Sequence, residues 1–224
     1  MKNHFAGDRK RLDHFLRGYE EKLVRAFLPL VPPWIGTVLL TLLTFLWAAL
    51  VVLFGFLSAG NIQWLWGFSA CIFFQYVTDM LDGEVGRQRN TGLVKWGFYM
   101  DHFLDYVFSC AVIAGYSFLL PSSHFYLVLL WLVAGSGFLV HAFLDFGVTN
   151  EFKISFNRFG VSEVRHALIL LNTVLIFSGK ELFASVIPFI VAVFWVVLGT
   201  LIYQSQASYR DMDRQNGKTP VGDI

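Results

Sequence analysis

TDMLDGEVGRQRNTGLVKWGFYMDHFLDY, residues 78–106, gathers four aspartates, one glutamate, two arginines and one lysine in a chain that is otherwise strongly apolar. Hydrophobic residues make up 56% of the 224 residues, charged residues make up 15%, and the mean hydropathy is +0.58. This composition is typical of integral membrane proteins. The net charge of +1 gives no indication of a nucleic acid as partner. So much charge in such a chain calls for a chemical reason.

Six apolar stretches are long enough to cross a bilayer core, which needs about 20 apolar residues in a helix. They cover residues 34–57, 64–81, 97–120, 124–146, 167–179 and 182–203. The fifth is short and is predicted to begin earlier, within the SEVRH sequence at 162–166. Short breaks rich in Ser, Gly, Pro and Asn favour antiparallel helix hairpins. The predicted fold class is all-α: an integral membrane six-helix bundle, with residues 31–207 as its membrane domain.

Lysine and arginine indicate the orientation, because cytoplasmic loops retain them. Placing both termini in the cytoplasm assigns 16 of the 17 Lys and Arg residues to that side. The charged stretch at 78–106 then lies at the cytoplasmic end of the bundle. The N-terminus has charges where a signal peptide needs an apolar core, so we expect no cleaved leader. The chain is predicted to be a multi-pass membrane protein.

The N-terminal segment has the pattern of an amphipathic helix. Between residues 8 and 28, apolar side chains recur at helical spacing among Arg and Lys: Leu12, Phe15, Leu16, Tyr19, Leu23 and Phe27. This pattern favours an interfacial helix on the cytoplasmic leaflet, within a cytoplasmic segment 1–30. An ordinary solvated helix is the alternative. Residues 208–224 are predicted to form a polar, loosely ordered cytoplasmic tail.

The aspartates of the charged stretch form two pairs. Asp79 and Asp82, three residues apart, end the second predicted span, and Asp101 and Asp105, four apart, begin the third. Each pair projects from one helical face, and a hairpin would bring the two faces together near the cytoplasmic membrane surface. Four carboxylates at one partly desolvated place repel one another, so we expect cations as their partners.

Hard divalent cations suit clustered oxygen ligands, and no His or Cys set nearby indicates zinc. Two ions would neutralise the four carboxylates, and Mg²⁺ (or Mn²⁺) is favoured because it shares its coordination shell with substrate phosphates. Gly83 and Gly86 extend the Asp79/Asp82 face without side chains, so a bulky ligand can approach the backbone. Arg87 adds a planar cation suited to phosphate.

These residues resemble a known family motif. The pattern D-x2-D-G-x2-G-R-x9-G-x3-D-x3-D from Asp79 to Asp105 is similar to that of the CDP-alcohol phosphotransferase (CDP-alcohol phosphatidyltransferase) family, class I integral membrane enzymes. Gly86 stands where the family usually has Ala, and a smaller residue should keep the close approach. PPWIGTVLLTL at 32–42 is similar to a family segment ending P-N-x-x-T: Thr41 fits the Thr, while Thr37 and Val38 replace Pro and Asn. RFGVSEVRH at 158–166 resembles the family's G-P-T-E-R, with Val161 in place of Pro.

The resemblance implies a phosphotransferase of phospholipid synthesis. An acceptor hydroxyl attacks the β-phosphorus of a CDP-linked alcohol, CMP leaves and a phosphodiester forms. Carried over by position, Asp79, Asp82, Asp101 and Asp105 would hold two metal ions, and Asp105 would also take the proton of the acceptor hydroxyl. The same comparison implies CDP binding by Asp82, Gly83, Gly86, Arg87 and Thr41, and it implies a homodimer. Carboxylates beside metal ions agree with this chemistry.

The sequence leaves more than one donor and acceptor as candidates. A short chain of bacterial type favours CDP-diacylglycerol as donor and a bacterial inner membrane as location, whereas D-H-x-x-L-D is similar to eukaryotic enzymes that use CDP-amino alcohols. The candidate acceptor-binding residues are His102, Arg158, Glu163 and Arg165. His102 has packing as its alternative role, and the basic residues have membrane orientation as theirs.

Two other classes of function compete with this interpretation. Intramembrane carboxylates with Gly-interrupted helices also occur in ion-coupled transporters, which often show inverted repeats and charges near the bilayer midplane. Neither feature is visible in this sequence. A catalytically inactive relative is the second alternative, although all four aspartates and Arg87 are present.

Overall fold

The computed structural model describes residues 16–150 and 160–216, which contain helices and no strands. Short 3₁₀ turns, Leu28–Leu30, Ile62–Trp64 and Ser122–His124, precede or follow some of the α-helices. The α-helices are α1 (Arg17–Phe27), α2 (Thr37–Gly60), α3 (Leu65–Gln88), α4 (Val94–Ser117), α5 (Phe125–Thr149), α6 (Val161–Ser178) and α7 (Glu181–Asn216). The all-α prediction is confirmed.

Four of these helical segments are long and apolar enough to cross a membrane: Thr37–Gly60, Ser122–Thr149, Val161–Ser178 and Glu181–Gln215. Helices α3 and α4 have the same length as α2, 24 residues, but their carboxylates make them less apolar. The fifth predicted span does begin before residue 167, at Val161. The chain is therefore an integral membrane protein by the length and composition of its helices.

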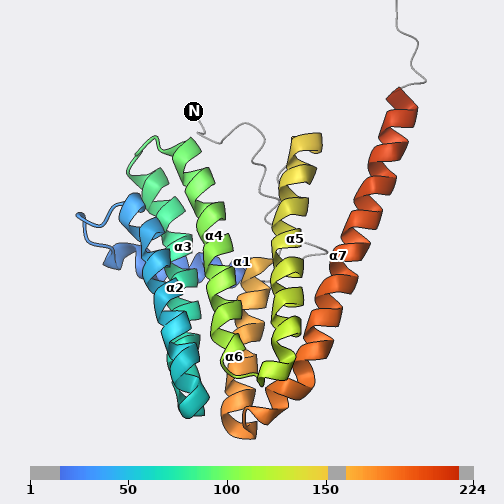
Figure 1. The fold of residues 1–224 in the computed structure, drawn as a ribbon. Coiled ribbons are helices and arrows are strands. Elements are labelled where there is room, and N and C mark those ends of the chain that lie inside the picture. The colour runs from blue at the N-terminus through green and yellow to red at the C-terminus, as the bar shows by residue number, and fades with distance from the viewer. Residues whose placement is uncertain (1–15, 151–159, 217–224) are drawn as a thin grey trace, which may run out of the picture.

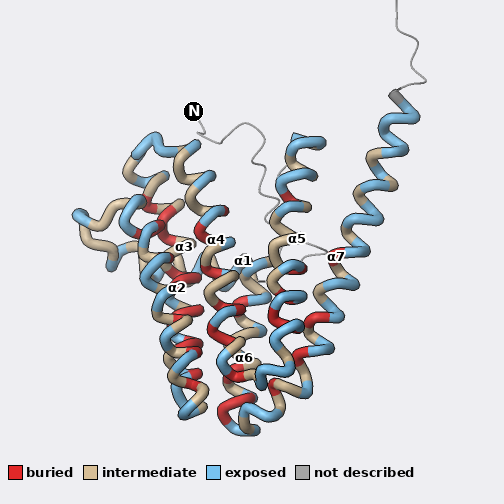
Figure 2. Tube along the Cα trace, in the orientation of Figure 1, coloured by how far each residue is buried: buried red, intermediate tan, exposed pale blue. Residues whose placement is uncertain are grey.

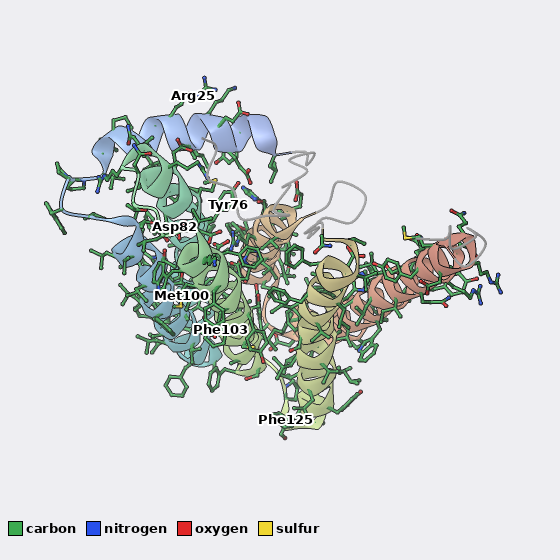
Figure 3. The ribbon with its side chains drawn as sticks, turned by 90° about the horizontal axis from the view of Figure 1, so that it is seen from above. Arg25, Tyr76, Asp82, Met100, Phe103 and Phe125 are labelled. Atoms are coloured by element: carbon green, nitrogen blue, oxygen red, sulfur yellow. The ribbon has the colours of Figure 1, made fainter. Side chains whose placement is uncertain are left out.

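Figure 1 shows α2, α3 and α4 side by side, with α5, α6 and α7 forming the other part of the molecule. Helix α6 packs against α3, and α5 packs against both α4 and α7. Helix α7 leans away from α5 toward its C-terminus (Figure 1). Helix α1 runs across the bundle rather than along it, and it contacts α3 (Figures 1 and 3). The ends of α3, α4 and α6 near α1 are the region of the predicted site.

The core lies between the facing sides of the helices, where Figure 2 shows the buried residues. A polar layer crosses this core: the Tyr116 hydroxyl donates to Oδ1 of Asn172 at 2.6 Å, and Nδ2 of Asn172 donates to Oγ of Ser69 at 3.0 Å. These three residues are buried and come from α4, α6 and α3. Hydrogen bonds of this kind hold helices together in a membrane, where apolar contact alone has little preference for protein over lipid.

Helices α2 and α4 approach most closely where two glycines meet. A Cβ on Gly55 would lie 2.5 Å from the Cα and the carbonyl oxygen of Gly115, and a Cβ on Gly115 would lie 2.6 Å from the Phe68 ring. Glycine at both positions lets the two backbones touch. Similarly, a Cβ on Gly137 of α5 would lie 2.7 Å from Leu198 of α7. Gly115 of α4 and Gly137 of α5 thus serve packing within one chain.

Gly55→Ala is expected to destabilise the protein by about 1–3 kcal/mol, because its methyl group has only backbone to displace. Gly60→Ala is the matched control: it lies in the same helix with nothing within 4 Å of its Cβ. The measurement is the thermal midpoint of tryptophan fluorescence in detergent. Equal midpoints for Gly55→Ala and wild type would show that α2 and α4 do not cross at this pair.

The ends of the predicted elements needed correction in two places. The charged connection expected over residues 82–96 is mostly helical, since α3 continues to Gln88, α4 starts at Val94, and Asn90 and Gly92 make the turn with φ of 48° and 70°. The expected loose tail is wrong at its start, because α7 stays helical through Asn216. Polar residues there have adequate helix propensity, which hydropathy does not register. Residues 1–15, where the amphipathic segment was predicted to begin, lie outside the described part of the chain.

Candidate active site

Three of the four aspartates converge between α3 and α4. One carboxylate oxygen each of Asp79, Asp101 and Asp105 lies within 4.8 Å of the others. Their side chains are half-buried, 20–28% exposed. Asp101 and Asp105 are one helical turn apart on α4, so their shared face meets Asp79 across the helix pair. The structure thus brings Asp79 of the first predicted pair to Asp101 and Asp105, and this group of three does not include Asp82.

Arg165 from α6 bridges two of these carboxylates. Its Nη1 donates to Oδ2 of Asp79 at 2.9 Å, and its Nη2 donates to Oδ1 of Asp105 at 2.7 Å. Arg165 is only 7% exposed, so the guanidinium side of these ion pairs is shielded from water. The planar fork of a guanidinium suits two separate carboxylates in a way that the point charge of lysine does not. Arg165 therefore belongs to the same site as the aspartates.

The residues of this cluster fit a hard divalent cation. Carboxylate oxygens are the preferred ligands of Mg²⁺ and Mn²⁺. Three carboxylates whose oxygens lie within 4.8 Å of one another concentrate negative charge in a half-buried place. Such a concentration of carboxylates suits a bound cation. The number of ions and the identity of the metal stay predictions.

Asp82 does not belong to the group of three carboxylates. It is 8% exposed, and its Oδ2 accepts a hydrogen bond from Oγ1 of Thr41 at 2.7 Å. The Thr37 hydroxyl donates to the backbone carbonyl oxygen of Asp82 at 2.8 Å. Two threonines one turn apart on α2 therefore hold the end of α3. The structure brings Thr41 to Asp82, and the role of Asp82 as a metal ligand stays a prediction.

Thr41→Val is expected to lower the free energy of unfolding by about 1–3 kcal/mol, because a buried carboxylate loses a donor. Valine keeps the shape of threonine, and Thr41→Ser, which keeps the hydroxyl, is the matched variant that should stay close to wild type. Thermal midpoints of the three proteins in the same detergent give the comparison. If the valine and serine variants were indistinguishable, the Thr41–Asp82 hydrogen bond would be energetically unimportant.

The predicted CDP-binding residues lie further along α3. Arg87 pairs with Glu84, with Nη2 to Oε2 at 2.7 Å, and its side chain is 64% exposed. A Cβ on Gly83 would lie 3.4 Å from Nη1 of Arg87, so this guanidinium lies beside the bare backbone of Gly83. A Cβ on Gly86 would lie 3.3 Å from the Thr37 hydroxyl. Gly86 thus faces α2, and its contact with cytidine stays a prediction, as do those of Gly83 and Arg87.

The predicted acceptor-binding residues fall in different places. His102 is buried, with Nδ1 2.6 Å from the Phe98 carbonyl oxygen, and it lines an apolar cavity of about 140 Å³ between α4 and α5. Oε2 of Glu163 accepts from the Gly160 amide at 2.7 Å and caps the start of α6. Arg158 lies outside the described residues. Of this set, Arg165 pairs with Asp79 and Asp105, and Nδ1 of His102 lies 3.7 Å from Oδ2 of Asp101.

Sequence reasoning missed residues that support this site. Thr37 stands out in the sequence only as a replacement for Pro in the P-N-x-x-T segment, yet it fixes the backbone at Asp82. Tyr76 carries no motif of its own, although it stands one turn before Asp79 and its ring lies beside Arg165, 5.7 Å from ring centroid to Cζ. A spacing of three or four residues from a motif residue was the available signal in both cases.

A helical membrane protein with a half-buried acidic cluster beside a buried arginine is suited to reactions of phosphate-bearing substrates. The sequence model of one such family, CDP-alcohol phosphatidyltransferase, matches residues 37–203, three quarters of the chain. The chain belongs to this family. The predicted family membership is confirmed. A comparison with curated proteins gives no match.

Family membership defines the general activity. The protein is a membrane phosphotransferase of phospholipid synthesis that uses a CDP-linked donor and an alcohol acceptor. The family uses divalent metals, and the aspartate cluster supplies a place for them.

Proposed function

We propose that this protein transfers a substituted phosphate from a CDP-linked donor to an alcohol acceptor and releases CMP, with CDP-diacylglycerol as the favoured donor and a CDP-amino alcohol as the second candidate. The convergence of Asp79, Asp101 and Asp105 within 4.8 Å is the observation that supports it best. The spacing of the motif and the family match over residues 37–203 agree with it.

Two divalent cations, Mg²⁺ or Mn²⁺, bound by Asp79, Asp82, Asp101 and Asp105 would offset the negative charge of the diphosphate and of the departing CMP. Asp105 accepts the proton from the acceptor hydroxyl as a general base. Asp82, held by Thr41, supports the nucleotide side of the site. The half-buried position of the cluster strengthens each charge interaction, because little water screens it.

Substrate binding is divided between two sets of residues. On the nucleotide side, Gly83 and Gly86 let cytidine approach the backbone of α3, and Arg87 binds phosphate. On the acceptor side, Arg165 is the residue that we place closest to the reaction, with His102, Glu163 and Arg158 as further candidates. The contacts of Arg165 with Asp79 and Asp105 support its role, since a cation there can orient the carboxylates or a phosphate.

The proposed membrane arrangement rests on the distribution of charged residues and on the position of α1. Helices α2–α7 form six spans, and α1 lies on the cytoplasmic leaflet as an interfacial amphipathic helix. Both termini are cytoplasmic, in a bacterial inner membrane, with residues 1–30, 31–207 and 208–224 as N-terminal segment, catalytic membrane domain and tail. Two copies form a homodimer. The bias of Lys and Arg and the crossing of α1 over the bundle support this orientation (Figure 3).

The test is an assay of CMP release by the purified protein in detergent. CDP-diacylglycerol and CDP-ethanolamine are each offered with a panel of alcohol acceptors, in Mg²⁺ or in EDTA. Release with one donor that requires Mg²⁺ establishes the reaction and identifies the nucleotide-bearing partner. Bound CDP without turnover for any pair would favour an inactive relative. Folded protein that binds neither CDP nor Mg²⁺ would contradict the proposal and favour the transporter.

A further inference from the structure

One carboxylate of α1 accepts hydrogen bonds from two other helices. Oε1 of Glu20 accepts a hydrogen bond from the Tyr76 hydroxyl at 2.9 Å and another from Oγ of Ser162 at 2.6 Å. Tyr76 belongs to α3 and Ser162 to the first turn of α6. Tyr76 is 1% exposed, so its hydroxyl depends on a protein partner. Glu20 thus connects three helices at one point, and Figure 3 shows Tyr76 near α1.

The two partners of Glu20 both lead to Arg165. The guanidinium carbon of Arg165 lies 5.7 Å from the centroid of the Tyr76 ring, within the range of a cation–π contact. Ser162 precedes Arg165 by three residues and lies one turn before it on α6. A displacement of Tyr76 or of the first turn of α6 would therefore displace the guanidinium.

His166 makes further contacts in the same region. The His166 ring meets the Tyr76 ring edge-on at 5.3 Å and the Tyr19 ring at 5.9 Å. Its Nδ1 lies 2.8 Å from the Ser162 carbonyl oxygen. Two neighbouring residues of α1, Tyr19 and Glu20, thus touch the side chains that surround Arg165. The contacts run from α1 through Tyr76 and α6 to the aspartates.

We propose that α1 positions Arg165 across Asp79 and Asp105, and that Glu20 and Tyr76 are the positioning residues through which it acts. The inference rests on the proposed function for its meaning in catalysis, and on the hydrogen-bond distances given above for its geometry. Arg165 occupies one oxygen of each carboxylate, so it competes with a divalent cation for these atoms. A guanidinium that is held in place is harder to displace than one that is free to move.

The experiment uses the full chain in detergent, without substrate, and two readouts. Electron paramagnetic resonance measures the dissociation constant of Mn²⁺, and hydrogen exchange measures the protection of residues 17–27 and 161–166. Glu20→Ala removes the acceptor, Glu20→Gln keeps a carbonyl oxygen for the two hydroxyls, and Tyr76→Phe removes one donor but keeps the ring. Glu21→Ala is the matched control, because Glu21 is the next residue of α1 and its ion pair with Arg25 lies on the surface.

Glu20→Ala and Tyr76→Phe are expected to bind Mn²⁺ about three- to tenfold more tightly than wild type and to exchange faster at 161–166. Glu20→Gln and Glu21→Ala should stay within about twofold of wild type in Mn²⁺ affinity. The direction is diagnostic, because general loosening of the site would weaken Mn²⁺ binding. Unchanged or weaker Mn²⁺ binding in Glu20→Ala, with α1 exchanging faster, would overturn the proposal.

The outcome is separable from that of the proposed function. A wild-type protein that binds Mn²⁺ but shows no CMP release would contradict the proposed reaction. The Mn²⁺ affinities of wild type and the variants would still test whether α1 positions Arg165. A wild-type protein without Mn²⁺ binding would contradict the metal site. In that case hydrogen exchange at residues 161–166 tests the positioning role. If Glu20→Ala protected these residues as well as wild type does, the positioning role would be overturned.

Discussion

Asp105→Asn is expected to lower the rate of metal-dependent CMP release by at least about 10³-fold, because one substitution removes the proposed general base and a proposed metal ligand together. Asparagine has nearly the same shape as aspartate, so the helix packing around α4 is preserved. It loses the charge that pairs with Nη2 of Arg165 at 2.7 Å. The Asp79 pair remains, which keeps one partner for the guanidinium.

Asp145→Asn is the matched control. Asp145 lies on α5 and accepts a hydrogen bond from the Tyr209 hydroxyl of α7, and the Asn oxygen can still accept it. We expect this variant to release CMP within about twofold of wild type. Thermal midpoints establish that both variants are folded. If folded Asp105→Asn kept more than about a tenth of the wild-type rate, Asp105 would be neither the base nor an essential ligand.

The sequence was sufficient to predict what depends on spacing along one helix. Asp101 and Asp105 share a face because they are four residues apart, and hydrophobic length predicted helices of membrane-spanning size. The hairpin between α3 and α4 is short, so Asp79 had to come near that face. The convergence of Asp79, Asp101 and Asp105 therefore follows from residue spacing and one short turn.

Contacts between helices that are distant in sequence could not be predicted from residue spacing. The Asp79–Arg165 pair spans 86 residues, and the Thr41–Asp82 bond spans 41. Each depends on the rotation and axial shift of α6 or α2 against α3, which apolar periodicity does not fix to the precision of one side chain. A resemblance singled out Arg165 as an acceptor residue, but its two carboxylate partners depend on how α6 packs.

The ends of the helices were also predicted poorly from the sequence. Hydropathy marks where a segment leaves the hydrocarbon core, whereas a helix ends where its backbone hydrogen bonds end. Helix α3 therefore runs to Gln88, past its apolar part, and carries Gly83, Gly86 and Arg87 on a helix rather than in a loop. Helix α7 continues to Asn216, although it is mostly exposed beyond Leu198 (Figure 2).

Arg165→Gln is expected to change stability and metal binding in opposite directions. Without divalent cation, the variant leaves Asp79 and Asp105 without their shared buried partner, since Arg165 is only 7% exposed. Loss of one member of a buried pair costs about 3–5 kcal/mol, and the carboxylates are about a fifth exposed, so we expect a loss of about 2–3 kcal/mol. With the competing cation removed, Mn²⁺ should bind at least about tenfold more tightly.

The measurement is the thermal midpoint with and without Mg²⁺. A ligand that binds only the folded state stabilises it in proportion to the logarithm of its concentration over its dissociation constant. Mg²⁺ should therefore raise the midpoint of Arg165→Gln more than that of wild type. Arg165→Lys, a point charge without the fork, should lie between the two.

These two effects separate the roles open to Arg165. A residue that only balances charge would be replaceable by the cation, so saturating Mg²⁺ would restore both the stability and the CMP release of Arg165→Gln. If Arg165 also binds the acceptor, CMP release by Arg165→Gln would stay about 10²-fold below wild type after Mg²⁺ restores its stability. The defect would then be a raised KM for the acceptor. We expect the second result, because the guanidinium bridges Asp79 and Asp105 and lies beside the Tyr76 ring. Full recovery of activity in Mg²⁺ would assign Arg165 to charge balance alone.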